Sequence, residues 1–241
     1  MGGSFVLLFA FALAASFLQR VSGFGFGILI MTVLPYIMPS YGEATALSGL
    51  LAMVTSGIVV FQKWRLIPWR KLLPILVTFM IVSWFAVLIV AHQPGNVIHR
   101  VLGVVLILAS LWFFFFSDRV KLRPSLGVQV SMGTISGMMG GLFGMQGPPA
   151  VIYFLSASAG KDEYVAISQA YFLIGNIVMT VFRWNSGFVT TAVGQAWLAA
   201  IVAVLLGGWL GAVVFERLSA KAVRKVAYAY MAVSGVVTLL S

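Results

Sequence analysis

The chain has 241 residues, of which 61% are hydrophobic and 8% are charged, and its formal net charge is +10. Soluble domains carry about 25% charged residues, so this sequence cannot cover the surface of a water-soluble globule. The composition excludes a soluble enzyme, a nucleic-acid-binding domain and a disordered chain. It predicts an all-α polytopic membrane protein whose positive charge lies in cytoplasmic loops and not against a nucleic acid.

Reactive side chains are scarce. The chain has no cysteine and only two histidines, which stand in no cluster with aspartate or glutamate. We therefore expect no disulfide, no bound metal and no cofactor. The sequence also lacks a Gly-x-x-x-x-Gly-Lys-Ser/Thr phosphate loop, and so it does not predict ATP hydrolysis by the chain itself. Zinc-protease and Ser/His patterns are missing too, which disfavours an intramembrane enzyme.

Apolar segments follow one another along the chain, separated by charged or Pro/Gly-rich breaks. A helix that crosses a membrane needs about 20 mainly apolar residues. The segments at 27–38 and 150–159 are too short for this, so we expect about 8 membrane segments, or up to 10 if the short ones cross. In chain order, the candidate segments are residues 4–18, 27–38, 44–61, 72–91, 97–116, 126–142, 150–159, 164–182, 189–215 and 222–240.

Each short segment follows a glycine-rich break, at residues 23–27 and 144–149, and the two breaks are about 120 residues apart. The same shift pairs Glu43 with Glu163, Ser48 with Ser168, and the Lys63-Trp64 pair with Arg183-Trp184. This single register predicts an internal duplication. Its first repeat covers residues 1–120 and its second covers residues 121–241.

Loop charge predicts opposite orientations for the two repeats. The loops at 62–71, 117–123 and 216–225 are rich in Lys and Arg, which places them in the cytoplasm. The loops at 92–100 and 183–187 each hold one arginine and are expected outside. Because Lys63 and Arg183 then lie on opposite sides, we expect inverted-topology repeats, each built from a glycine-broken helix pair and three spanning helices. Re-entrant short segments and short full spans both satisfy this pattern.

The glycine breaks are the strongest candidates for substrate binding. Non-helical backbone at membrane depth is tolerated where it is buried in protein or lines a cavity. A helix that starts at such a break directs free N–H groups and a partial positive charge toward an anion. Close helix packing is the alternative, because small residues also let backbones approach. The candidates at the breaks are Gly23, Gly25, Gly27, Gly144, Gln146 and Gly147.

Three further polar side chains interrupt apolar helices. Arg20 lies between the apolar helix and the first break, where a guanidinium suits an oxyanion; a loop position at the membrane surface is the alternative. Gln169 and Asn176 are seven residues apart and share a helix face. They either line a cavity or form hydrogen bonds between helices.

Two acidic residues, Glu43 and Glu163, each begin a helix after a turn. An acid in the first turn of a helix complements the helix dipole, which gives both residues a structural explanation. The alternative is a role in coupling transport to H⁺ or Na⁺.

The two breaks resemble the motifs of the TauE/SafE family of membrane permeases, also called the sulfite exporter or toluene-sulfonate-uptake family. The similarity extends to the duplicated hydrophobic blocks over most of the chain. Compared with the family's richer glycine triplets, Phe26 interrupts the first copy, whereas Gln146 and two prolines alter the second. The motifs are Gly23-Phe24-Gly25-Phe26-Gly27 followed by Pro35, and Gly144-Met145-Gln146-Gly147-Pro148-Pro149.

The resemblance implies transport of sulfur-containing oxyanions, such as sulfite, sulfoacetate or another organosulfonate, across a bacterial inner membrane. It also implies that the glycine breaks form the binding region. We therefore expect a secondary transporter for a small sulfur-containing or organic oxyanion, with a midplane site between the two breaks. An anion channel of the same architecture is the alternative. The expected partners are the anionic substrate, lipid and a coupling ion, H⁺ or Na⁺; assembly into a homo-oligomer is left open.

Overall fold

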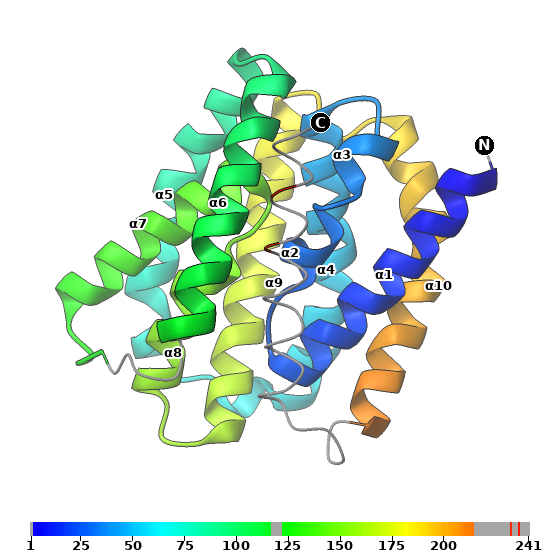
Figure 1. The fold of residues 1–241 in the computed structure, drawn as a ribbon. Coiled ribbons are helices and arrows are strands. Elements are labelled where there is room, and N and C mark those ends of the chain that lie inside the picture. The colour runs from blue at the N-terminus through cyan, green and yellow to red at the C-terminus, as the bar shows by residue number, and fades with distance from the viewer. Residues whose placement is uncertain (1, 117–121, 215–231, 233–235, 237–241) are drawn as a thin grey trace.

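The computed structural model describes residues 2–116, 122–214, 232 and 236. Within these residues the chain forms helices and no strand, which confirms the all-α expectation (Figure 1). The elements are α1 (Gly2–Ser22), α2 (Phe26–Ile30), α3 (Leu34–Ile37), α4 (Tyr41–Lys63), the 3-10 helix η1 (Trp64–Leu66), α5 (Trp69–His92), α6 (Gly95–Phe116), α7 (Leu126–Phe143), α8 (Gly147–Ala157), α9 (Lys161–Asn185) and α10 (Thr191–Val214).

Several helices are suited to lipid. Within the described residues, 5 helices are long and apolar enough to cross a membrane: Ser4–Ser22, Tyr41–Leu66, Trp69–His92, Lys161–Asn185 and Thr191–Val214. The chain is therefore a multi-pass membrane protein. The expected segment at 222–240, the basic loop at 216–225 and most of the loop at 117–123 lie outside the described residues. The total of about 8 to 10 segments stays a prediction.

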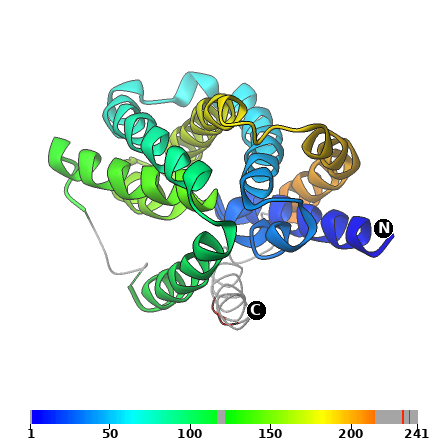
Figure 2. The same cartoon turned by 90° about the horizontal axis from the view of Figure 1, so that it is seen from above.

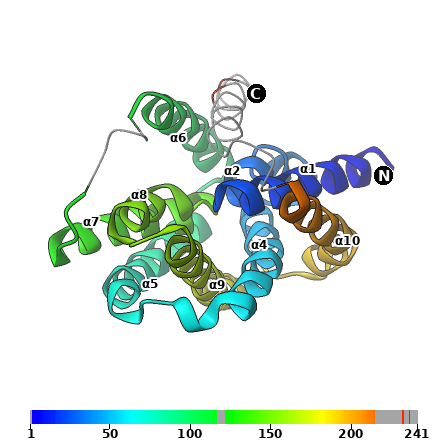
Figure 3. The same cartoon turned by 90° about the horizontal axis from the view of Figure 1, so that it is seen from below.

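The long helices form three packed pairs. Helix α1 packs along α10, α5 packs along α7, and α4 packs against α9. Seen from above and from below, α1 and α10 lie at one end of the molecule and α5 and α7 at the other, with α4 and α9 between them (Figure 2 and Figure 3). The two glycine breaks therefore reach the middle of the bundle from opposite ends.

Glycines at every fourth position allow two of these pairs to pack closely. On α7, a Cβ at Gly133 would lie 2.7 Å from the carbonyl oxygen of Ile75 on α5, and Gly137 and Gly141 continue the same face. On α10, a Cβ at Gly207 would overlap the carbonyl oxygen of Leu13 on α1. Small residues at this spacing bring membrane helices into backbone contact.

The helix boundaries recur with the predicted shift. Helix α1 ends at Ser22 and α7 at Phe143, α4 begins at Tyr41 and α9 at Lys161, and α5 begins at Trp69 and α10 at Thr191; these offsets are 120 to 122 residues. The duplication and the inverted orientation of its halves stay predictions.

The two short apolar segments differ from each other. Residues 27–38 form two short helices, α2 and α3, of 5 and 4 residues. Residues 150–159 belong largely to α8, a single helix of 11 residues. At 1.5 Å per residue, α8 spans roughly half of a hydrocarbon core of about 30 Å. None of these helices crosses a membrane by itself.

Candidate functional site

The two glycine breaks adopt backbone conformations that side chains resist. Gly23 has φ of 85° and Gly25 has φ of 104°, which ends α1 and redirects the chain into α2. Gly144 has φ of 69° and ends α7. Backbone N–H groups at this cap donate hydrogen bonds to the carbonyls of Gly140 and Met139. Glycine populates this left-handed region without steric cost. The local sequence therefore explains both breaks.

The breaks meet each other in the centre of the bundle. Gly27 lies against the carbonyl oxygen of Gly144, so closely that a Cβ at Gly27 would overlap this oxygen. A small chamber of about 30 Å³ lies between the breaks. Its lining includes Gly25, Gly27, Gly144, Gln146, Gly147 and Asn176. Segments that are distant in sequence thus form one contact, with space for about one water molecule.

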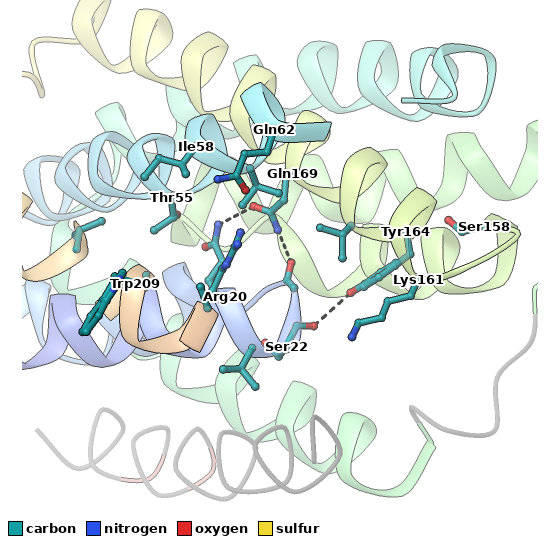
Figure 4. A pocket seen from close by; sticks show the side chains of 18 of the residues that line it. Arg20, Ser22, Thr55, Ile58, Gln62, Ser158, Lys161, Tyr164, Gln169 and Trp209 are labelled. Atoms are coloured by element: carbon teal, nitrogen blue, oxygen red, sulfur yellow. Dashed lines mark hydrogen bonds between the residues drawn. The ribbon is translucent and has the colours of Figure 1, made fainter. Parts of the chain in front are cut away.

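A much larger cavity, of about 810 Å³, lies beside this contact. It is formed by the ends of α1, α4 and α10 and by the beginning of α9 (Figure 4). Its described lining contains two cations, Arg20 and Lys161, and no aspartate or glutamate. Amide and hydroxyl groups complete the polar part of the lining, from Gln19, Ser22, Thr55, Gln62, Ser158, Tyr164 and Gln169.

Arg20 lies in the last turn of α1 and lines the large cavity. Its stem packs on α10, where a Cβ at Gly211 would lie 2.7 Å from the Cβ of Arg20. Its guanidinium extends into the space shared with Gln62 and Gln169 (Figure 4). No hydrogen bond or ion pair links Arg20 to another residue in the described part of the chain. Arg20 thus lies in a helix and not in a loop, and its role in binding stays a prediction.

Gln19, which the sequence analysis did not single out, separates the two cavities and lines both. Its Nε2 donates to Ser56 Oγ at 3.0 Å and to Gln169 Oε1 at 3.1 Å. Gln169 Nε2 in turn donates to the carbonyl of Gly23 at 2.9 Å. This network ties α1, α4 and α9 together beside the first break. Gln169 therefore both lines a cavity and bridges helices.

The remaining amides lie on the small chamber. Gln146 is 5% exposed and its Nε2 donates to the carbonyl of Phe172 at 3.3 Å, whereas its Oε1 is buried without a partner among the described residues. Its own carbonyl accepts a hydrogen bond from Ser136 Oγ. Asn176 lies seven residues after Gln169 on the same face of α9. It lines the small chamber and not the large cavity.

Helix N-termini contribute fewer anion donors than the sequence suggested. Helix α2 has only 5 residues, too few for a substantial dipole. Helix α8 carries Pro148 and Pro149 in its first turn, and proline has no backbone N–H. The two helix N-termini therefore offer few free backbone N–H groups.

The two candidate coupling residues lie away from both cavities. Glu163 Oε1 pairs with Lys71 Nζ at 2.6 Å, next to a second ion pair of 2.6 Å between Lys63 and Asp162. Glu43 is buried and accepts hydrogen bonds from Ser40 Oγ at 2.9 Å and Thr190 Oγ1 at 2.6 Å. Ser40 caps the start of α4, because its Oγ accepts a hydrogen bond from the backbone N–H of Glu43 at 3.2 Å.

Arg183 was expected in the loop at 183–187, and the structure corrects this. Helix α9 continues to Asn185, and Arg183 is 1% exposed within the bundle. Its Nη2 donates to the carbonyl of Gly140 at 2.9 Å, whereas Nη1 has no partner among the described residues.

Comparison with known proteins identifies the family of the chain. A family model described as the sulfite exporter TauE/SafE matches residues 8–238. The chain belongs to the TauE/SafE family. Among curated relatives, a probable sulfite/organosulfonate exporter TauE of Cupriavidus necator is 23% identical over 206 residues, covering 80% of this chain and 79% of its own length. A probable membrane transporter protein of Methanocaldococcus jannaschii is 24% identical over 260 residues, covering 97% and 95%. No solved structure matches the chain.

Membership of the TauE/SafE family identifies the chain as a membrane transporter. Family membership does not say what the two cavities, the glycine contact and Arg20 do in transport.

Proposed function

We propose that this TauE/SafE member is a secondary transporter for a small sulfur-containing or organic oxyanion, such as sulfite, sulfoacetate or another organosulfonate, in a bacterial inner membrane. The observation that carries the proposal is the position of Arg20, in a large cavity whose described lining contains no acidic residue. The printed name of the Cupriavidus necator relative supports the sulfonate class.

The lining suits both parts of an organosulfonate. A guanidinium forms two parallel hydrogen bonds to an oxyanion, and the nearby amides supply further donors. Ile58, Leu205 and Trp209 provide apolar surface in the same cavity for the carbon portion. Few polar groups in a mainly apolar pocket are typical of sites for small ligands.

The glycine contact favours a transporter over an anion channel. The large cavity reaches the ends of α4 and α9, near Lys63 and Asp162, and on its inner side it ends at Gln19 and the packed breaks. A cavity that is closed at one end suits alternating access, in which one repeat moves against the other around a central site. A conducting channel needs a continuous pore instead.

Glu43 is the better of the two candidates for a coupling site. It is buried and its described side-chain partners are hydroxyl groups, whereas Glu163 is neutralised by Lys71. We therefore assign coupling, by H⁺ or Na⁺, to Glu43.

A thermal-shift screen of the purified protein tests the proposed substrate class. Sulfite, sulfoacetate, sulfate and simple carboxylates are added one at a time. Because a ligand that binds only the folded state raises apparent stability, we expect sulfite or a sulfonate to raise the melting temperature more than a carboxylate of equal charge. A shift with carboxylates alone would contradict the sulfonate assignment.

A further inference from the structure

Arg183 continues a row of polar residues on one face of α9. Gln169, Asn176 and Arg183 are each seven residues apart, which corresponds to steps of about 10 Å along a helix. Gln169 lines the large cavity and Asn176 lines the small chamber. Arg183 therefore lies one further step along this face of α9. The glycine contact lies between Arg183 and Arg20.

The charge of Arg183 is not balanced within the described part of the chain. Its side chain is 1% exposed and forms no ion pair with a described carboxylate. Nη2 donates to the Gly140 carbonyl, but Nη1 is buried without a partner among the described residues. Because a buried and unpaired cation is costly, such a residue in a membrane protein usually serves a function.

Gly49 of α4 lies directly beside this nitrogen, and the absence of a side chain at Gly49 permits the close approach. A Cβ at Gly49 would lie 3.2 Å from Arg183 Nη1, 3.6 Å from Asn176 Oδ1 and 3.8 Å from Thr180 Oγ1. The Thr180 hydroxyl is itself buried without a described partner. Three polar groups thus converge on the one position of this α4 turn that carries no side chain.

We propose that Arg183, Asn176 and Thr180 form a second oxyanion site, which binds the transported sulfite or sulfonate on the far side of the glycine contact from Arg20. The inference rests on the proposed transport function. In the conformation described here, α4 covers this site while the Arg20 cavity is open. Separation of α4 from α9 would expose Arg183 to the extracytoplasmic side, because it lies at the opposite end of α9 from Lys161.

Transport measured separately from each face tests this site. Right-side-out and inside-out membrane vesicles are given radiolabelled sulfite or sulfoacetate. For Arg183→Gln we expect the KM at the extracytoplasmic face to rise about tenfold or more, as for the loss of a charged hydrogen bond, with a change of less than about threefold at the cytoplasmic face. Arg183→Lys should recover part of the loss, since a point charge replaces the planar fork.

A second variant leaves the guanidinium in place. Gly49→Ala puts a methyl group 3.2 Å from Arg183 Nη1 and should also raise the outer KM selectively. Gly57→Ala is its matched control on the same helix, because its Cβ would meet only Leu173 Cδ1, at an ordinary 3.9 Å. Gly57→Ala should transport like the wild type from both faces.

The outcomes separate the two proposals. If the wild type transports neither probe, the proposed function is wrong. If the wild type transports and both Arg183→Gln and Gly49→Ala match Gly57→Ala at the outer face, the Arg183 site alone is overturned. Equal KM changes at both faces would likewise overturn it, because they indicate a structural role.

Discussion

Two arginines on opposite sides of the glycine contact differ in how they are held. Arg20 lies in an open cavity at the end of α1, with no described hydrogen-bond partner. Arg183 is enclosed between α4, α7 and α9 and is anchored through one nitrogen to Gly140. Neither forms an ion pair with a described acid. The proposed transport path assigns both charges to the bound anion.

Substitution of Arg20 tests the first of these charges. We expect Arg20→Gln to weaken binding of sulfite or sulfoacetate about 10- to 100-fold, which corresponds to the roughly 1.5–3 kcal/mol of a hydrogen bond to a charged group. Isothermal titration of the purified variant measures the change. Arg65→Gln is the control, since Arg65 is exposed on η1 and stacks on Trp64 outside the cavity. Equal affinity in both variants would remove Arg20 from the site.

Gly27 and Gly147 look equivalent in the sequence, but the structure predicts different effects when each is replaced by alanine. A Cβ at Gly27 overlaps the Gly144 carbonyl, whereas a Cβ at Gly147 meets its nearest atoms at 3.6 Å. We therefore expect Gly27→Ala to abolish exchange of radiolabelled sulfoacetate in proteoliposomes and Gly147→Ala to retain it. Gly127→Ala, with nothing within 4 Å of its Cβ, controls for the substitution itself. Loss of exchange in Gly147→Ala would show that the chamber, and not the close contact, sets the constraint.

Sequence reasoning located some of these residues and missed others for identifiable reasons. Arg20 was found because a charge beside a glycine break in an apolar helix stands out. Gln19 was missed because an amide next to an arginine gives no periodic signal. Arg183 was misplaced because the span was expected to end at residue 182, whereas α9 continues to Asn185. An error of three residues at a helix end, which is common, changed an apparent loop residue into a buried one.

At the scale of elements, glycines set the distance between paired helices. The face of α7 with Gly133, Gly137 and Gly141 lies on α5, and Gly207 and Gly211 of α10 lie on α1. The sequence analysis offered close packing only as the alternative explanation of the breaks. The structure shows close packing at both places, at glycines inside the long helices and at Gly27 of the first break, which lies against the Gly144 carbonyl.

A substitution in the α1–α10 contact tests this packing role. Gly207→Ala directs a methyl group at the Leu13 carbonyl, and overpacking of this kind costs roughly 1–3 kcal/mol. We expect a lower apparent melting temperature for the purified variant. Gly194→Ala is the matched control on α10, because its Cβ meets nothing within 4 Å. If the two variants have the same melting temperature, this contact does not hold α1 and α10 together.

Element boundaries were predictable where apolar length and turn residues agree. Ser40 and Ser125, each before an apolar run, cap α4 and α7 as serine caps do elsewhere. The segment at 27–38 was less predictable, since it divides into α2 and α3 around residues 31–33. Apolar composition alone gives no sign of such a division, because both pieces consist mainly of apolar residues.

At the scale of the molecule, the cavity and the covered Arg183 site give the bundle one open and one closed end. The open end carries the Lys63–Asp162 and Lys71–Glu163 ion pairs, which tie the α4–α5 connection to the start of α9. The closed end carries Thr190 bonded to Glu43, and Phe188 packed on Gly42. If loop charge sets orientation, the open end faces the cytoplasm. Cysteine labelling of the two ends tests this directly.

The cysteine-free chain permits single reporters at each end. Leu66→Cys reports on the basic loop and Asn185→Cys on the end of α9, and both positions are exposed. With a membrane-impermeant thiol reagent on intact cells, we expect Asn185→Cys to be labelled at once and Leu66→Cys only after the membrane is opened. Ala46→Cys, at a position with 0% exposure, should stay unlabelled and controls for penetration of the reagent. Labelling of Leu66→Cys and Asn185→Cys from the same side would overturn the inverted repeats, and with them the cytoplasmic assignment of the Arg20 cavity.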